Sequence, residues 1–408
     1  MEDTRSTPQK FQQESRITAI SFSLTHLPGG EHFPPLNRPI RIVQANSLFN
    51  GGGVDTQTLE LTQGLHELGC HVRLAVGAGS RWEPRAHALG VPVIGFPSRS
   101  PLRWRAIAAL RQSLTTHRAD ILHVHQGCDY WPAIVAARLA GRGTRVFITR
   151  HLMTRPRGFS RRFLLSGARV IAVSHAVERV LRSELQGNPD RILQAHCGID
   201  VDRFAGGRGP ESEALRQAAG WGPENVVFGV VGMYPLPRGK GQLEFLAAAA
   251  RIRSSHPHAR FVLIGHGNMR PLIEQQIAAD QLADIVRLEP FTDDIRPWMK
   301  ALDVLVHPAV GTDAFPLVVL EGMASGHPVV ASRLDGIPEE FTDGNQGFLV
   351  TPGSADELAM KMGKLAESAD LRWTMGERGR RHVAEHFTRH HLATATLALY
   401  RAALGNRT

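Results

Sequence analysis

Residues 40–76 read IRIVQANSLFNGGGVDTQTLELTQGLHELGCHVRLAV, and this stretch contains the pattern that decides the fold. Its apolar start predicts a short strand, and the three glycines at 51–53 predict a tight turn after that strand. Leucines at helical spacing within residues 54–68 predict a helix, with Gly69 placed to end it. A second apolar run follows. The stretch therefore predicts a β–α–β unit with a glycine-rich turn between strand and helix.

The same alternation continues along the chain after this stretch. Further apolar runs, each predicted as a strand, occupy residues 121–124, 146–149, 170–173, 226–231, 261–264, 285–288, 304–307 and 329–331. Continuous apolar runs are typical of parallel strands that are buried on both faces by helices. Residues 205–223 interrupt the series with several glycines, Pro210 and Pro223, so we expect the linker between two domains there.

We therefore predict an α/β fold with two doubly wound domains whose ligand sites face each other across a cleft, outside the carboxyl ends of the strands. The predicted division has four parts: a disordered N-terminal extension at residues 1–38, a first domain at 39–208, a second domain at 209–387, and a final helix at 388–408 that packs back towards the first domain.

Composition narrows the class of protein. Of the 408 residues, 42% are hydrophobic and 21% are charged, as in soluble globular proteins. The three cysteines are far apart and form no CxxC pattern, so we expect neither a disulfide framework nor a zinc site built on cysteines, and a reducing cytoplasm. No apolar run approaches the roughly 20 residues that span a bilayer.

The net charge of +9 is concentrated in part at residues 150–162 (RHLMTRPRGFSRR), which contain five arginines and Phe159. Such a segment attracts phosphates of an anionic lipid surface or of a nucleic acid. The alternative is a solvated basic face. Only 6% of residues are aromatic and no zinc finger or helix-turn-helix pattern is evident, so we expect no nucleic-acid partner.

The loop after the strand at 226–231 reads GMYPLPRGKGQ and carries Arg238 and Lys240 just before a predicted helix. A diphosphate would lie against this helix N-terminus, and fixed cations would stabilise the charge that develops on it as a leaving group. The alternative is a basic surface loop.

The densest signal is at residues 307–326 (HPAVGTDAFPLVVLEGMASG), where Asp313 and Glu321 lie eight residues apart. Glu321 falls within an otherwise apolar helix, and a buried carboxylate needs hydrogen-bond partners. Hydroxyl groups of a ribose or another sugar would supply them; a structural salt bridge is the alternative.

These segments together resemble the retaining glycosyltransferases of the GT-B class, family 4 (glycosyl transferases group 1). The similarity runs in order from about residue 40 to residue 386, which is far more specific than any single motif. The matching segments are 51–53, 120–125, 171–174, 197–204, 230–241, 262–267, 313–321, 329–339 and 347–350.

The resemblance implies two Rossmann-like domains and transfer of a sugar from a nucleotide-sugar donor to a cell-envelope glycan or lipid-linked acceptor, of the lipopolysaccharide or exopolysaccharide type. It implies no metal and no other cofactor, and a location in the cytoplasm at the inner face of the membrane. The catalytic candidates that it implies are Lys240, Arg238, Asp313 and His151. The donor-binding candidates are Gly52, Gly53, Gly265, Phe291, Thr292, Phe315, Pro316, Leu317 and Glu321.

Three positions depart from the family pattern: Asp313 replaces a glutamate, Pro316 a glycine and Met233 an arginine. These departures leave the donor sugar open. Three alternatives remain: a sugar-nucleotide epimerase of the same fold, a basic nucleic-acid-binding protein, and an inactive paralogue kept as a partner subunit.

Overall fold

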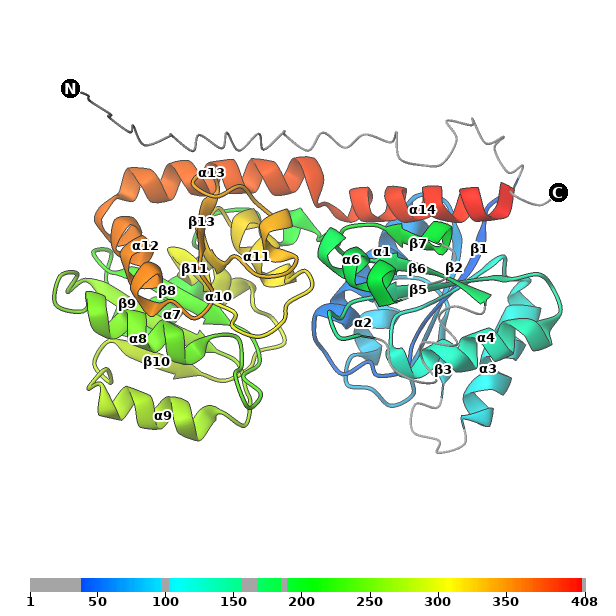
Figure 1. The fold of residues 1–408 in the computed structure, drawn as a ribbon, viewed down its shortest axis with the longest axis horizontal. Coiled ribbons are helices and arrows are strands. Elements are labelled where there is room, and N and C mark those ends of the chain that lie inside the picture. Colours follow the sequence, from blue (N-terminus) through cyan, green and yellow to red (C-terminus); the bar gives the residue numbers. More distant parts are fainter. Residues whose placement is uncertain (1–37, 97–102, 156–166, 185–188, 406–408) are drawn as a thin grey trace, which may run out of the picture. The chain divides into compact units, whose positions relative to one another are not determined.

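The computed structural model describes residues 38–96, 103–155, 167–184 and 189–405. Leu36–Thr408 form one compact unit that contains two parallel β-sheets, each with helices on its faces (Figure 1). This confirms the predicted α/β class with two Rossmann-like domains. The extension predicted at residues 1–38 lies outside the described residues except for Arg38, whose guanidinium is 2.6 Å from a carboxylate oxygen of Asp120.

The first sheet has the strand order β3-β2-β1-β4-β5-β6-β7. Its strands are β1 (Arg41–Asn46), β2 (His71–Gly77), β3 (Val93–Phe96), β4 (Ile121–Val124), β5 (Arg145–Arg150), β6 (Ala168–Ala172) and β7 (Ile192–Gln194). The strand order reverses between β1 and β4, and ligands of such sheets bind beside this reversal, at the carboxyl ends of the strands. The sequence predicted five of these strands but not the short edge strands β3 and β7.

The second sheet has the order β10-β9-β8-β11-β12-β13, with its reversal between β8 and β11. Its strands are β8 (Val226–Val231), β9 (Ala259–Ile264), β10 (Val286–Glu289), β11 (Val304–His307), β12 (Val329–Ser332) and β13 (Gly347–Val350). Five of the six were predicted within two residues at each end. The sixth, β13, is one of the two edge strands and was not predicted.

The helices that cover the first sheet are α1 (Gly53–Glu67), α2 (Glu83–His87), α3 (Trp104–His117), α4 (Tyr130–Ala140) and α6 (His175–Glu184). The helices that come later in the chain are α7 (Pro210–Ala218), α8 (Gln242–Ile252), α9 (Arg270–Ala279), α10 (Arg296–Ala301), α11 (Leu317–Ala324), α12 (Ala355–Glu367), α13 (Ala369–His386) and α14 (Arg389–Gly405). Helix α7 lies inside the segment predicted to contain the linker; Pro210 at its first turn and Ser212, which bonds back to Gly209, start it.

The last helix, α14, packs against α1 of the first sheet. The two helices approach so closely that a Cβ on Gly64 of α1 would lie 2.7 Å from the Cβ of Ala393. Farther along α14, the buried Tyr400 hydroxyl is 2.6 Å from Nδ1 of His123 on β4. The chain therefore returns to its first sheet after completing the second.

Candidate active site

The predicted site residues follow the carboxyl ends of the central strands. Lys240 lies in the loop between β8 and α8, Asp313 in the loop between β11 and α11, and Gly52 in the turn between β1 and α1. These are the strands beside the reversal of order in each sheet, where doubly wound folds bind their ligands.

Lys240, Asp313 and His307 form a connected polar group. Nζ of Lys240 lies 2.7 Å from Oδ2 of Asp313, and Nε2 of His307 lies 2.9 Å from the same oxygen. Burial opposes the ionisation of Asp313, but the bonds and charges from His307 and Lys240 outweigh burial and lower its pKa below the ordinary value. The result is an ionised aspartate that holds the ammonium group of Lys240 at the carboxyl ends of the central strands.

Glycines hold the loop around Lys240 in place. Gly241 has a φ of +83°, and a Cβ there would lie 1.9 Å from the carbonyl oxygen of Pro308. Gly265, with a φ of +156°, would bring its Cβ within 2.1 Å of the Gly232 carbonyl oxygen. Only glycine permits both the positive φ and this close backbone approach.

Arg238 extends from the same loop and is exposed, without a hydrogen bond or ion pair to any described residue. Met233, which stands where the family pattern has an arginine, is 52% exposed. The only other cation that the sequence places in this loop is therefore free to meet a ligand.

Glu321 is the fifth residue of α11, a helix that starts directly after Pro316. Its carboxylate accepts no hydrogen bond from a described residue; only its backbone carbonyl is used, by Ser325. Burial raises the pKa of Glu321 to about 7, against the opposing charge of Arg203. The salt bridge considered as an alternative for Glu321 is not found among the described residues.

The glycine turn of the first sheet faces the start of α11. A Cβ built on Gly53 would lie 4.0 Å from Cδ1 of Leu317, whereas one on Gly52 would meet no atom within 4 Å. The turn is held by Asp55, whose Oδ2 accepts the backbone N–H groups of Asn50 (2.9 Å) and Gly51 (2.7 Å). Open space thus remains beside Gly52, at the N-terminal ends of two helices.

His151 follows β5 and belongs to a row of histidines. Burial lowers the pKa of His151 to about 3, so its ring is neutral, and its buried Nε2 has no partner among the described residues. The ring of His125 is 5.8 Å away between centroids, and Nε2 of His125 lies 2.8 Å from Oε1 of Gln44. A neutral imidazole with an unused nitrogen can bind a sugar hydroxyl but carries no charge.

The remaining candidates fall into two groups. Phe291 is 37% exposed and meets the ring of His266 edge to face at 5.2 Å, whereas the Thr292 hydroxyl turns back to the carbonyl of Asp294. Phe315 is 6% exposed and stacks on His196 at 5.1 Å. Phe315 can therefore offer a ligand its backbone, while its side chain fixes the loop.

Sequence reasoning missed several residues that hold this site. His307, Asp55 and Asp335 are not among the candidates that the sequence indicates. Asp335 adopts a φ of +47° and accepts the N–H of Asp313 at 2.9 Å. Only the position of Asp55 in the first turn of a predicted helix gave a signal, because acidic side chains there bind free N–H groups.

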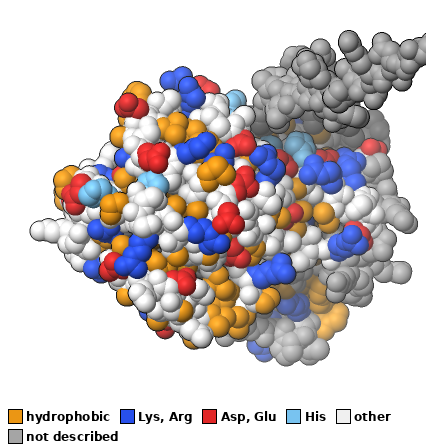
Figure 2. Space-filling model, turned by 60° about the vertical axis from the view of Figure 1, so that its left-hand side comes forward, with side chains coloured by type: hydrophobic (Ala, Val, Ile, Leu, Met, Phe, Trp, Pro, Cys, Tyr) orange, Lys and Arg blue, Asp and Glu red, His pale blue; other side chains and the backbone are white. Residues whose placement is uncertain are grey.

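The basic segment at residues 150–162 differs from its prediction at Arg150. Arg150 is only 7% exposed and bonds to Thr154, so it is not part of a surface patch. Arg155 is exposed and pairs with Glu184 at 3.2 Å. Arg157, Phe159, Arg161 and Arg162 lie outside the described residues. Elsewhere, on the face shown in Figure 2, basic, acidic and hydrophobic side chains are interspersed.

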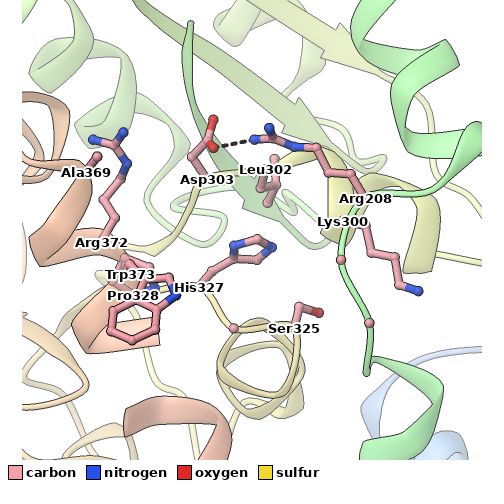
Figure 3. A pocket seen from close by; sticks show the side chains of 13 residues that line it. Arg208, Lys300, Leu302, Asp303, Ser325, His327, Pro328, Ala369, Arg372 and Trp373 are labelled. Carbon is pink, nitrogen blue, oxygen red and sulfur yellow. Dashed lines mark hydrogen bonds and ion pairs between the residues drawn. The ribbon is translucent and has the colours of Figure 1, made fainter. Parts of the chain in front are cut away.

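A pocket of about 290 Å³ lies apart from these residues (Figure 3). It is lined by Asp303 and Pro328, which precede β11 and β12, and by Ser325 at the end of α11. It is thus at the amino ends of the strands, opposite the predicted site, and part of its wall is closed by the ion pair of Arg208 with Asp303. Among the described residues no helix has the length and apolar character to cross a bilayer.

Comparison with known families supports the fold and the chemistry. Residues 51–203 match the profile described as Glycosyltransferase Family 4, and residues 225–368 match Glycosyl transferases group 1. D-inositol 3-phosphate glycosyltransferase of Streptomyces scabiei is 30% identical over 232 residues, which are 54% of this chain and 50% of that protein. The chain thus matches half the length of this relative.

Two solved glycosyltransferases share the fold. Anabaena HepE, solved in complex with UDP and glucose, has a TM-score of 0.77 at 21% identity, over 89% of this chain and 100% of that one. WaaG, described as a glycosyltransferase involved in lipopolysaccharide biosynthesis, has a TM-score of 0.63 at 18% identity, over 88% and 99%. From its fold and from both of its family matches, the chain belongs to the family 4 glycosyltransferases of the GT-B fold.

Proposed function

We propose that this glycosyltransferase moves a sugar from a nucleoside-diphosphate donor to a cell-envelope glycan or lipid-linked acceptor, with net retention at the anomeric carbon. The observation that carries the proposal is the group formed by Lys240, Asp313 and His307, in which Asp313 belongs to the loop that leads into the helix of Glu321. Lys240 offers positive charge for a diphosphate, and Glu321 offers a ribose a carboxylate that has no partner among the described residues.

In this proposal the donor diphosphate lies between Lys240 and the N-terminal end of α11, where the first N–H groups lack intrahelical acceptors. Arg238, exposed on the same loop, adds a second cation. The ribose hydroxyls donate to Glu321, and the base rests beside Gly265 and Phe291. UDP-sugars are the first donors to test, because the structurally similar HepE was solved with UDP and glucose.

The transfer breaks the bond between the anomeric carbon and the donor phosphate oxygen and forms a bond from that carbon to an acceptor hydroxyl oxygen. The acceptor proton passes to the leaving phosphate oxygen. Negative charge that grows on the diphosphate meets Lys240, whose position Asp313 fixes before the donor arrives. Positive charge from side chains and a helix end supports a reaction that needs no metal.

The acceptor is proposed to bind on the side of the first sheet, beside Gly52 and the neutral ring of His151. An acceptor of the lipopolysaccharide type is favoured by the structural similarity to WaaG. We propose a cytoplasmic enzyme that reaches a lipid-linked acceptor at the membrane face; Arg155 remains on the surface for contact with anionic lipid.

The proposal is tested in two steps with the full chain. Thermal unfolding with UDP, GDP and ADP, and then with their sugars, should identify one nucleotide that raises the melting temperature. The selected donor, labelled in its sugar, is then incubated with lipid-linked and soluble glycan acceptors. Label in the acceptor supports transfer, whereas a changed free donor without transfer would indicate an epimerase. Stabilisation by no nucleotide would contradict the donor site.

A further inference from the structure

Two histidines and a glutamate converge at a place that the transfer reaction does not use. His175, His196 and Glu339 each offer a ligand atom, and all three atoms lie within 4.8 Å of one another. His175 begins α6, His196 follows β7, and Glu339 ends the short 3₁₀ turn Ile337–Glu339 after β12. Three separate segments of the chain, from both sheets, therefore meet in this group.

The distances between these ligand atoms suit a small metal ion with tetrahedral coordination. Nε2 of His196 is 3.1 Å from Oε2 of Glu339. Two ligands bound at 2.0–2.1 Å to a tetrahedral zinc ion are about 3.3–3.4 Å apart, so this pair is already close to the required spacing. The His175 side chain is 47% exposed, so its ring is free to move inward by the remaining distance.

The surroundings prepare the histidine ligands. Nδ1 of His175 is 3.1 Å from Oε2 of Glu178, so a proton held on Nδ1 leaves Nε2 with a free electron pair. A carboxylate that orients a ligating imidazole in this way is the usual companion of a zinc site. Glu339 is itself fixed, because its two oxygens accept the backbone N–H groups of His175 and Ala176 at 2.7 and 2.8 Å.

We propose that His175, His196 and Glu339 bind one Zn²⁺, with water as the fourth ligand, and that the ion ties α6 to the segment after β12. Two imidazoles and one carboxylate suit zinc, whereas magnesium and calcium prefer sites made of oxygen ligands. On binding, the ring proton of His196 moves from Nε2 to Nδ1, and zinc replaces the hydrogen bond to Glu339.

The site touches the candidate active site through one aromatic contact. The ring of His196 stacks on Phe315 with 5.1 Å between centroids, and Phe315 lies in the loop between Asp313 and α11. Zinc on His196 would therefore restrain the loop that we propose to hold the donor. The zinc site itself is independent of the proposed donor and acceptor.

The test uses the full chain without an affinity tag, freed of metal by a chelator and titrated with zinc chloride in competition with a chromophoric zinc indicator. We expect one tight equivalent. His175→Gln and Glu339→Gln should each weaken it at least tenfold. In Glu339→Gln the amide oxygen can still accept one of the two N–H groups that the carboxylate accepts from α6. His87→Gln on α2, whose side chain is 60% exposed, is the matched histidine control and should bind like the parent.

Cobalt(II) provides a second readout, because a tetrahedral site with nitrogen and oxygen ligands gives it a distinct visible absorption. The parent and His87→Gln should show this absorption, and His175→Gln should lose it. Zinc should also raise the melting temperature of the parent but not that of His175→Gln. The proposal fails if the parent takes up no zinc equivalent, or if His175→Gln and Glu339→Gln bind zinc as tightly as the parent.

Discussion

Nζ of Lys240 lies 2.7 Å from Oδ2 of Asp313, and this contact joins two loops whose residues are 73 positions apart in the chain. The aspartate also contacts the buried His307, so it is held from two sides. A carboxylate one methylene shorter than the family's usual glutamate therefore still reaches both a cation and an imidazole. The pair fixes the position of Lys240 before any donor is bound.

Lys240→Met should lower kcat by roughly 10²- to 10³-fold, on the scale of removing one donor that stabilises a developing anion. Steady-state rates with the donor selected by thermal unfolding measure this. Lys300→Met is the control, because Lys300 lines the pocket at the opposite ends of the strands. Equal rates for Lys240→Met and the parent would remove Lys240 from the diphosphate site.

The affinity for the nucleotide-sugar should depend on pH through Glu321. Since the pKa of Glu321 is raised to about 7, the carboxylate becomes ionised as the pH rises from 6 to 8 and then accepts stronger hydrogen bonds from the ribose. We expect the dissociation constant to fall about five- to tenfold over this range, from calorimetry at constant ionic strength.

In Glu321→Gln this pH dependence should disappear and the affinity should stay at the weak, low-pH level. Glu274→Gln is the matched control, because Glu274 lies on α9 with a half-exposed side chain. This variant should keep the pH dependence of the affinity. A variant Glu321→Gln that binds as tightly as the parent at pH 8 would show that Glu321 does not bind the ribose.

Gly241→Ala should disrupt the loop of Lys240. Both Gly241 (φ +83°) and Gly344 (φ +78°) adopt positive φ, but only at Gly241 would a Cβ meet backbone, 1.9 Å from the Pro308 oxygen. Gly344→Ala should cost about 1–2 kcal/mol from φ alone. Gly241→Ala should cost clearly more in chemical unfolding and should also reduce the turnover rate; equal costs would show that the loop relaxes freely.

Arg389→Met should destabilise the protein by about 3 kcal/mol, because it leaves Glu60, only 6% exposed, without its nearest cation. Arg389, the first residue of α14, bonds to Glu60 and Asp200 at 2.7 Å each. Arg251→Met is the control, since its partner Asp356 is 85% exposed and such pairs contribute about 0–1 kcal/mol. A similar loss in both variants, measured in urea, would contradict this role of Arg389.

Glu340→Gln should flatten the dependence of stability on pH. Glu340 is fully buried, neither carboxylate oxygen has a partner among the described residues, and burial raises its pKa well above the ordinary 4.5. The folded chain therefore holds this proton more tightly than the unfolded chain does. The resulting stability is complete below pH 4.5 and declines as the pH rises towards the folded pKa.

The free energy of unfolding should accordingly fall more steeply in the parent than in Glu340→Gln as the pH rises above 4.5. Glu367→Gln, on a side chain that is 69% exposed, should follow the parent. Parallel curves for Glu340→Gln and the parent would show that Glu340 is not a protonated buried acid.

The sequence predicted the central strands of both sheets because buried parallel strands appear as unbroken apolar runs, as in β4 and β11. It missed the edge strands β3, β7 and β13. A glycine interrupts the apolar residues of β3 and begins β13, and β7 has only two apolar residues, so none of the three is an unbroken apolar run. It also left the helix α7 unassigned, because the glycines around it resemble a linker. The roles of the individual site residues remain predictions.

The sequence by itself determined the two-domain α/β class, the order of its strands along the chain and the loops that carry Lys240, Asp313 and Glu321, because apolar periodicity and glycine positions are local properties. Only the tertiary structure decided which distant groups meet. It placed Asp313 on Lys240 and His307, buried Arg150 that the sequence had assigned to a surface patch, and brought His175, His196 and Glu339 together. Such contacts depend on how the sheets and helices pack, and residues far apart in the chain carry no local pattern that records their distance in space.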